Sequence, residues 1–489
     1  MAIIHLLHFD LFSGSFPNFP HGLAYIIGAL RTDKHEVTFS HLMQPSDYEY
    51  AAKLISSVKP DIIGLSFPTT QKQHVRHFLD NFDLQARLLI AGGSHARLVK
   101  ERIFEDFPAI DGVCIGEGEM PFRELCDRID KGKEYIDVEG FSFRTDSGII
   151  NNPITPVSDL DLLPMPDYSL FDYNRMVIES GGYFQMILSR GCPFDCSYCC
   201  NHIFQEVFRD KNKYVRFPSP QRAIEMIKKN LLLSPYPKTK IIAFLDDVFI
   251  CNSRWLSQFS GLYKKEINIP YMCYARIEYV NREVLGYLKE SGCSAIELGI
   301  ESGNEWLRRH ILNRRHSNET MEKAFAMIKE HKIKIGVFTM MGIPFETDSM
   351  QKDTIKLCMR LRPDFGLVSF FFPFPGTKIF QICSQYGLML DNLEKRLSGY
   401  YAGPSLKEIF NSHEKTIRNH QELQLFFYLR MVFGRYHLPA FFEKAAIFIL
   451  MPVRKPIFFF LNKSTKNIRM LKLIAALRRL AFSDLAHRG

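Results

Sequence analysis

The chain has 489 residues, of which 46% are hydrophobic and 24% are charged, a composition that excludes an intrinsically disordered protein. This length exceeds what one hydrophobic core usually serves, so we expect more than one domain. The formal net charge is +9, and ten basic residues against two acidic ones follow residue 440, so most of the excess lies in that tail. No run of about 18 uncharged apolar residues occurs, which argues against a membrane-spanning helix.

The first 150 residues alternate between apolar strands and amphipathic helices, a pattern that predicts a doubly wound parallel sheet of the α/β class. The first expected strand, residues 2–9, has no basic start and no cleavage site, so we expect a buried strand and a reducing, cytoplasmic environment. We expect further strands at residues 36–42, 61–67, 87–93 and 112–119, and helices at residues 21–32, 48–58, 71–82 and 120–129. A hairpin is expected after them, with its turn at Asp146-Ser147-Gly148.

Small residues gather where three of these strands end. Ligands of doubly wound sheets bind outside the carboxyl ends of the strands, and glycine lets the backbone approach a ligand closely. The strand ends are formed by Ser66, by Gly92 and Gly93, and by Gly116, Glu117 and Gly118. Together they predict a binding crevice along one edge of the sheet.

Residues 151–180 are proline-rich and irregular, and we interpret them as a linker. Over residues 181–400 strands and helices alternate again, and six βα units predict a partial (β/α)6 barrel. Its expected strands are residues 183–190, 241–247, 271–277, 295–301, 333–342 and 365–372.

Residues 401–489 have no strand signals, so we expect a basic helical region. A basic amphipathic tail suits an anionic membrane surface, and it can equally be a solvated face that covers the body of the protein. Binding of nucleic acid would rest on this tail alone and is not expected.

Four cysteines are crowded into the stretch SRGCPFDCSYCC, residues 189–200. A disulfide framework is not expected in a reducing compartment, and a structural zinc site would need a second pair of ligands beyond the nearby His202. A redox pair would use Cys196 and Cys199 but would leave Cys192 unexplained. Three thiolates on one short loop suit an iron–sulfur cluster, and three ligands for four irons leave one iron open for chemistry.

The spacing C-x3-C-x2-C, with Tyr198 before the last cysteine, resembles the signature of radical S-adenosylmethionine (SAM) enzymes. The resemblance implies that Cys192, Cys196 and Cys199 hold a [4Fe-4S] cluster and that Tyr198 lies near the adenine of SAM. In that family the open iron binds SAM, and one electron splits it to release a 5′-deoxyadenosyl radical. Cys200 lies outside the pattern and is expected to be a buried small residue.

Further segments resemble the radical SAM enzymes that carry an N-terminal cobalamin-binding domain. In the barrel they are FLDDVF, YARIEYV, ELGIESGNE, MMGIPFET and FFPFPGT. The resemblance implies that SAM is contacted by Asp246, Asp247, Arg276 and Glu301. Where the family often has a lysine, this chain has Arg314 and Arg315, which keep the charge but not the geometry.

The N-terminal half resembles the cobalamin-binding domain of the same enzymes through DIIGLSF, LLIAGGSHA and IGEGEMPFREL. The resemblance implies that cobalamin lies at Ser66, Gly92, Gly93, Gly116, Glu117 and Gly118. Many such domains place a cobalt-ligating histidine after the first strand, but this chain reads Asp10-Leu11-Phe12-Ser13-Gly14 there. We therefore expect no histidine ligand, with His21 and His95 as the candidates to replace it, or else a domain that holds no cofactor.

The leading interpretation is a cobalamin-dependent radical SAM enzyme that transfers a methyl group to an unactivated carbon of a small-molecule or lipid-like substrate. The alternatives are radical cyclisation or rearrangement, and a non-catalytic SAM- or corrinoid-binding protein. A methylthiotransferase would need three more cluster cysteines in the N-terminal domain, where only Cys114 and Cys126 occur. The resemblance also implies an electron donor such as flavodoxin or ferredoxin.

Overall fold

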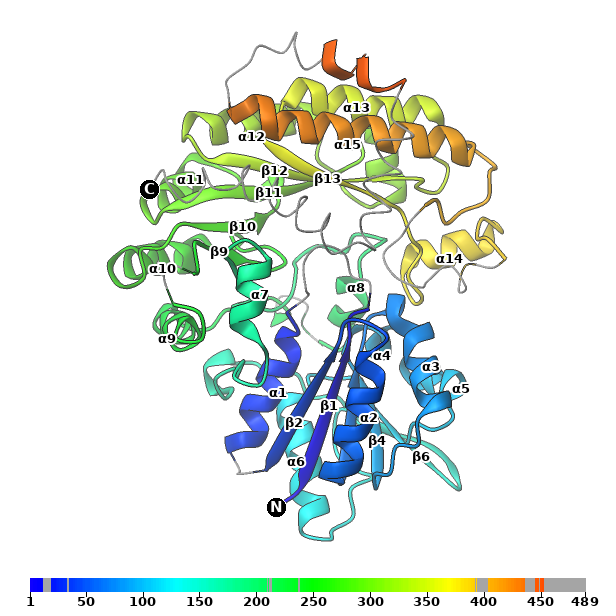
Figure 1. Ribbon diagram of the computed structural model, residues 1–489. Helices are drawn as coiled ribbons and strands as arrows, with labels where there is room; N and C mark the ends of the chain where they lie inside the picture. The colour runs from blue at the N-terminus through cyan, green and yellow to red at the C-terminus, as the bar shows by residue number, and fades with distance from the viewer. Residues whose placement is uncertain are drawn as a thin grey trace.

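The computed structural model describes residues 1–11, 19–32, 35–208, 210, 213–235, 238–391, 393, 403–435, 445–447 and 449–452. Two sheets dominate it, the N-terminal one below and the second one above in Figure 1. The carboxyl ends of the N-terminal strands point toward helix α8 (Asn201–Gln205) and the second sheet (Figure 1). The edge at which doubly wound sheets bind ligands therefore faces the other half of the molecule.

The N-terminal sheet has the strand order β2-β1-β3-β4-β5-β6-β7. Its first five strands pair in parallel, and the hairpin of β6 and β7 adds to β5 in antiparallel fashion. Thr145 pairs with Gly148, so the hairpin turn is Asp146-Ser147, as expected to within one residue. The strands are β1 (Ile3–Phe9), β2 (Glu36–Leu42), β3 (Ile62–Ser66), β4 (Leu88–Gly92), β5 (Gly112–Cys114), β6 (Phe141–Thr145) and β7 (Gly148–Asn151).

Helices cover both faces of this sheet, which confirms the doubly wound prediction. α1 and α6 share one hydrophobic cluster with β1, and α2, α3, α4 and α5 share a second cluster on the opposite face. The helices are α1 (His21–Thr32), α2 (Asp47–Val58), α3 (Lys72–Asn81), α4 (Gly93–Val99), α5 (Ile103–Asp106) and α6 (Glu119–Asp130).

The second sheet is the expected partial barrel of six parallel strands, in the order β13-β12-β11-β10-β9-β8. The strands are β8 (Tyr183–Met186), β9 (Ile241–Phe244), β10 (Tyr271–Ala275), β11 (Cys293–Glu301), β12 (Lys334–Met341) and β13 (Phe365–Phe370). β8 ends four residues before the expected position. The reason is that the amides of Leu188 and Ser189 donate to the carboxylate of Asp246.

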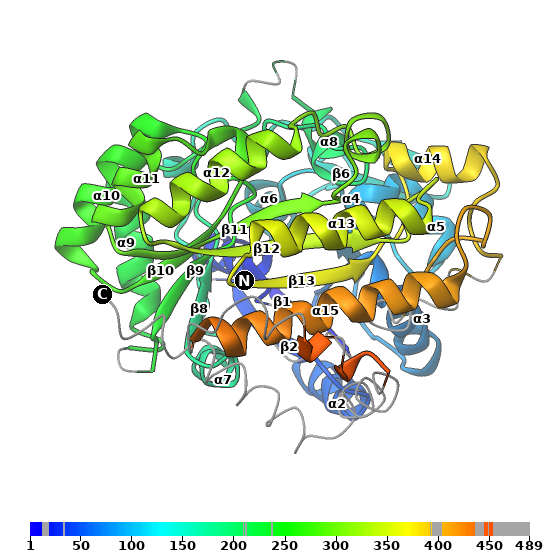
Figure 2. The same cartoon turned by 90° about the horizontal axis from the view of Figure 1, so that it is seen from above.

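Helices α10, α11, α12 and α13 follow one another along the outer side of this sheet, as seen from above in Figure 2. α15 packs on α13 and on the edge strand β13, and it supplies the helix expected after residue 400. The helices are α9 (Pro220–Leu231), α10 (Ser253–Glu266), α11 (Arg282–Glu290), α12 (Asn318–Glu330), α13 (Asp348–Leu361), α14 (Lys378–Gln385) and α15 (His413–Arg435).

Part of the segment between the two sheets is buried. It contains α7 (Tyr173–Glu179), which the proline-rich pattern did not predict. Tyr168 and Tyr173 are at most 2% exposed and belong to a hydrophobic cluster that contains residues of both sheets. Beside them, a Cβ on Gly28 would lie only 2.1 Å from the carbonyl oxygen of Met165, so α1 and this segment pack backbone to backbone. The two halves therefore share one continuous core.

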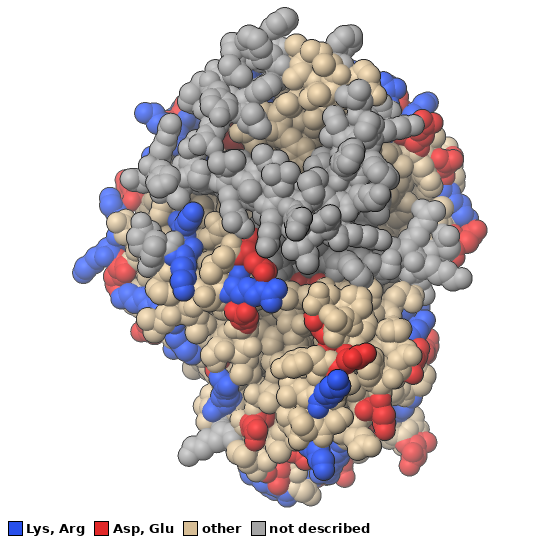
Figure 3. Space-filling model, viewed as in Figure 1, with Lys and Arg blue, Asp and Glu red and all other residues tan. Residues whose placement is uncertain are grey.

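Charges of both signs are interspersed over the described part of the face shown in Figure 3, so no patch of a single sign forms there. Within the described ranges, no helix is both long enough and apolar enough to cross a bilayer. The basic tail, for which a membrane-binding face and a solvated face are equally open, lies almost entirely outside the described residues, and its role stays a prediction.

Candidate active site

The cysteine-bearing loop follows β8, at the carboxyl edge of the barrel sheet, where barrel enzymes place their chemistry. Asp246, which follows β9, anchors the start of this loop by accepting hydrogen bonds from Leu188 N at 3.0 Å and from the backbone and hydroxyl of Ser189. Burial raises the pKa of Asp246 to about 6, against the effect of these donors. All three hydrogen bonds go to Oδ1, whereas Oδ2 is buried without a partner among the described residues, so the expected contact of Asp246 with SAM stays a prediction.

Donors surround the three cysteines of the loop. Cys192 and Cys196 are buried and Cys199 is half-buried. Arg276 donates from Nη1 to the sulfur of Cys196 at 3.1 Å, and the Asn201 amide donates to the sulfur of Cys199 at 3.6 Å. A hydrogen bond from the Cys200 thiol lowers the pKa of Cys199 to about 7, whereas burial raises the pKa of Cys192 to about 12.

The three sulfurs suit a cubane better than a single ion. In the described part of the chain, no three His, Cys, Asp or Glu side chains converge on a point that could hold one metal ion. A cubane does not require such convergence, because each thiolate binds a different iron. Donors directed at the sulfurs stabilise thiolate and tune a cluster, so the loop fits an iron–sulfur cluster.

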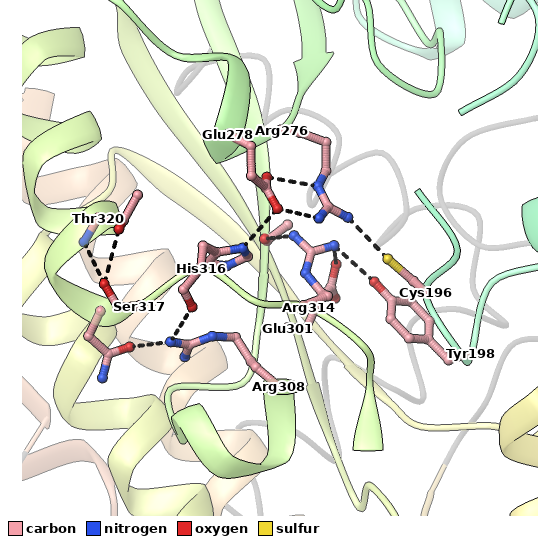
Figure 4. A network of polar contacts seen from close by, with 12 residues as sticks. Cys196, Tyr198, Arg276, Glu278, Glu301, Arg308, Arg314, His316, Ser317 and Thr320 are labelled. Carbon is pink, nitrogen blue, oxygen red and sulfur yellow. Dashed lines mark hydrogen bonds and ion pairs between the residues drawn. The ribbon is translucent and has the colours of Figure 1, made fainter. Parts of the chain in front are cut away.

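Arg314 joins two of the predicted SAM contacts (Figure 4). Its guanidinium lies 3.1 Å from the Tyr198 hydroxyl and 3.4 Å from Oε1 of Glu301, and it also donates to the carbonyl of Gly299. Glu301 has a φ of +63° at the end of β11, a strained conformation that turns its side chain at the barrel mouth. Tyr198, Glu301 and Arg314 therefore form one preassembled polar site beside the cysteines.

Arg276 is held in place from three sides. It lies over the ring of Phe194 at 3.8 Å, and its Nε and Nη2 donate to Glu278 at 3.1 and 2.6 Å. Glu278 also contacts Nδ1 of His316 at 3.1 Å, and although burial opposes its ionisation, His316 and Arg276 keep the pKa of Glu278 well below its usual range. Sequence reasoning missed Glu278 and His316, although the close spacing of Arg276 and Glu278 was a usable signal.

A cavity of about 490 Å³ separates the N-terminal sheet edge from the cysteine loop. All six residues that we expected to contact cobalamin line it, and so does Asp247, which we had assigned to SAM: Ser66, Gly92, Gly93, Gly116, Glu117, Gly118 and Asp247. From the barrel side, Arg190, Gly191, Cys200 and Asn201 complete the wall. The cavity therefore touches both halves of the molecule.

The edge of the N-terminal sheet that carries Gly92 and Gly93 fits a large ligand. A Cβ on Gly92 would meet no protein atom nearer than 3.9 Å, whereas one on Gly93 would lie 3.0 Å from Ser66 and would require a φ of +82°. Gly92 thus leaves open space beside the cavity, and Gly93 shapes the turn. This edge, which lies outside the barrel, suits the close backbone approach that a flat macrocycle such as a corrin requires.

Each of three histidines near the cavity contacts a protein group through Nδ1. Nδ1 of His21 contacts the Tyr168 hydroxyl at 2.7 Å, Nε2 of His21 is buried without a described partner, and the ring lies in the cavity wall. His95 contacts Thr69 at 3.1 Å and is not a lining residue. The wall also contains His8, which the sequence analysis missed and whose Nδ1 lies 3.1 Å from the carbonyl oxygen of Ser66.

The comparisons with known proteins agree with this geometry. The Radical SAM superfamily matches residues 186–358, and the B12 binding domain family matches residues 13–126. The chain is 28% identical over 380 residues to an "uncharacterized methyltransferase PH0819" of Pyrococcus horikoshii, a match that covers 76% of this chain and 80% of that protein. It is 22% identical over 385 residues to the anaerobic magnesium-protoporphyrin IX monomethyl ester cyclase of Rubrivivax gelatinosus, covering 76% of this chain and 66% of the cyclase.

Among solved structures, the fold is similar to that of OxsB, a cobalamin-dependent SAM radical enzyme with aqua-cobalamin and SAM bound. The TM-score is 0.70 and the identity 18%, and the match covers 100% of this chain and 76% of OxsB. The two family matches fall on the two sheets that flank the cavity, and the [4Fe-4S] cluster, SAM and cobalamin follow from them as cofactors. The chain belongs to the radical SAM enzymes that carry an N-terminal B12-binding domain.

Proposed function

We propose that this enzyme transfers a methyl group to an unactivated carbon of a small molecule. The observation that supports it best is the placement of the cysteine loop, with the Tyr198–Arg314–Glu301 site on one side and the glycine-edged cavity on the other. When bound, the cluster and SAM supply a carbon radical, and cobalamin supplies the methyl group.

The chain's own side chains have distinct tasks in this proposal. Cys192, Cys196 and Cys199 hold the cluster, and Arg276 donates to the sulfur of Cys196. Arg314 orients Tyr198 and Glu301, whose hydroxyl and carboxylate are suited to the polar groups of SAM. The buried walls around them exclude water, which protects a radical from side reactions.

The barrel interior narrows the substrate class. Glu297 pairs with Tyr274 across β10 and β11, and it shares its inward-facing side with Ala295 and Phe338. A Cβ on Gly336 would lie 2.7 Å from Cγ of Glu297, so this glycine makes room for the side chain. Within the described ranges the carboxylate has no hydrogen-bond or ion-pair partner, and burial raises its pKa to about 8. We therefore propose an aromatic or lipid-like substrate that presents a hydrogen-bond donor to Glu297.

Radical cyclisation is the second candidate, because a matched relative is a cyclase. Both reactions require a one-electron donor such as flavodoxin or ferredoxin, since reductive cleavage of SAM consumes an electron. The products distinguish them: methyl transfer yields S-adenosylhomocysteine together with 5′-deoxyadenosine, and cyclisation yields 5′-deoxyadenosine alone.

The experiment is an anaerobic assay of the reconstituted enzyme with SAM, a chemical reductant and hydroxocobalamin, followed by quantification of both nucleosides. Appearance of the two nucleosides in a substrate-dependent one-to-one ratio supports methyl transfer. Substrate-dependent 5′-deoxyadenosine without S-adenosylhomocysteine would overturn it in favour of cyclisation.

A further inference from the structure

Four buried charges connect the two halves of the molecule. Glu117 and Glu119 follow β5 of the N-terminal sheet, and Arg190 and Arg216 flank the cysteine loop of the barrel. Arg190 lies 3.0 Å from Oε1 of Glu117 and 2.5 Å from Oε1 of Glu119. Arg216 reaches both oxygens of Glu117, at 2.9 and 2.8 Å. All four side chains are at most 18% exposed, so the pairs are shielded from solvent.

Arg190 and Arg216 pair with each other at the base, or neck, of the loop that carries all three cysteines. The backbones of Arg190 and Arg216 exchange two hydrogen bonds, each of 2.9 Å, so residues 191–215 form a loop pinned at its base. Gly191, next to the neck, has a φ of +89°, and a Cβ there would lie 2.4 Å from the carbonyl oxygen of Tyr214. A shift of either arginine must therefore move the start or the end of the cysteine loop.

A chain of contacts runs from the neck to a cluster ligand. The hydroxyl of Tyr214, two residues before Arg216, donates to Oδ1 of Asn201 at 2.5 Å. The amide of Asn201 donates to the sulfur of Cys199 at 3.6 Å. Both Tyr214 and Asn201 also line the cavity. These contacts therefore connect the expected cobalamin site with Cys199, an expected ligand of the iron–sulfur cluster.

Glu117 and Glu119 lie on the loop that would contact cobalamin. Gly116 and Gly118, on either side of Glu117, line the cavity between the sheet and the cysteine loop. Both oxygens of Glu117 are already taken, by Arg216 and by the amide of Val157 at 2.9 Å. Burial opposes ionisation of Glu117, yet the two arginines lower its pKa to about 2. Glu117 therefore forms the ion pair, and because it also lines the cavity its expected contact with cobalamin stays a prediction.

We propose that the Glu117–Glu119–Arg190–Arg216 ion-pair cluster couples the two cofactor sites: a corrinoid seated in the cavity fixes the loop of residues 116–119, and the arginines pass that constraint to the cysteine loop. The inference rests on the proposed function, because it presumes both cofactors. Glu117, Glu119, Arg190 and Arg216 are positioning residues in this scheme. Coupling between two sites is reciprocal. The iron–sulfur cluster must therefore raise the affinity of the protein for the corrinoid by the same factor as the corrinoid raises its affinity for the iron–sulfur cluster.

The test titrates hydroxocobalamin, followed by its visible absorption, into the full chain under anaerobic conditions, with and without the reconstituted cluster. For the wild type we expect at least about fivefold tighter binding when the cluster is present, the low end of typical coupling. Hydroxocobalamin should also change the EPR spectrum of the reduced cluster. For Arg190→Gln, the ratio of the hydroxocobalamin affinities with and without the iron–sulfur cluster should approach one. Hydroxocobalamin should also no longer change the EPR spectrum of the cluster.

Two further variants keep the result interpretable. Glu119→Gln, which removes a negative charge that contacts Arg190, is the milder change if Arg190→Gln fails to fold. Arg190→Lys keeps the positive charge beside Glu117 and Glu119 and should retain part of the coupling that Arg190→Gln removes. An affinity ratio near one in the wild type, or an unchanged ratio in Arg190→Gln or Glu119→Gln, overturns the inference while leaving the proposed function intact. Absence of hydroxocobalamin binding in either form overturns both.

Discussion

The carboxyl edges of the two sheets face each other but are built in opposite ways. The N-terminal edge presents small residues, Ser66, Gly92 and Gly118, around a cavity of about 490 Å³. The barrel edge presents long charged side chains that are already paired, such as Arg314 with Glu301 and Arg276 with Glu278. The first arrangement provides room, and the second provides preorganised polar groups, whose positions need not change when a ligand arrives. The difference indicates that each edge is adapted to a different kind of cofactor.

The largest expected effect comes from replacing the three cysteines at the barrel edge. Serine at Cys192, Cys196 or Cys199 should lower SAM cleavage at least about 100-fold, because a hydroxyl is a poor ligand for cluster iron. The measurement is 5′-deoxyadenosine release after anaerobic reconstitution. Cys251→Ser, which changes a half-buried cysteine outside the loop, is the control and should retain release. Undiminished release in any of the three loop variants would contradict their assignment.

The N-terminal edge can be filled without touching the barrel. A valine at Gly92 should block the cavity and weaken hydroxocobalamin binding by at least about tenfold, equivalent to about 1.4 kcal/mol. The fold should survive because Gly92 has extended backbone geometry and open space around its Cβ position. Gly93→Val is the contrast, since its φ of +82° makes any side chain strained and should lower the melting temperature. Unimpaired hydroxocobalamin binding by Gly92→Val would show that the corrinoid lies elsewhere.

Substitution of Arg276 tests whether side chains at the barrel edge set the midpoint potential of the iron–sulfur cluster. Arg276→Met removes a cationic donor 3.1 Å from the sulfur of Cys196, so the midpoint potential of the cluster should fall. SAM cleavage should decrease by about tenfold or more, the magnitude of a lost charge-assisted hydrogen bond. Arg276→Lys should recover part of the potential because it keeps the charge. Equal potentials in wild type and Arg276→Met would rule out this role, whatever happens to activity.

The smallest expected effect concerns Glu297 and depends on pH. Its pKa in the folded protein is about 8, above the ordinary 4.5, so the folded state binds more protons between these values. Stability contributed by this group is therefore present below pH 4.5 and lost as the pH rises toward 8. The melting temperature of Glu297→Gln should exceed that of the wild type by a margin that grows from pH 5 to pH 8. A margin that is constant or shrinks with pH contradicts the assigned pKa.

Much of this architecture could be predicted from sequence because it depends on local periodicity and spacing. The strands, the doubly wound order and the position of the cysteine loop follow from alternation and from the three thiols. Pairings between distant segments leave no such trace. Nothing near Asp246 indicates that it binds the backbone at Ser189, and nothing near Glu117 reveals its arginine partners on the far side of the cavity. α7 was missed although Asp172 caps its first turn, and the burial of Tyr173, which the sequence does not show, contributes to its stability.

Above all, we propose that three thiolates hold a cubane whose fourth iron is open to SAM. The most direct measurement is EPR spectroscopy of the anaerobically reconstituted, reduced protein before and after addition of SAM. The account predicts the signal of a reduced [4Fe-4S] cluster, with about four irons per chain, and a shift of that signal when SAM binds. A protein that assembles no such cluster, or one whose cluster signal is unchanged by SAM, would contradict the account.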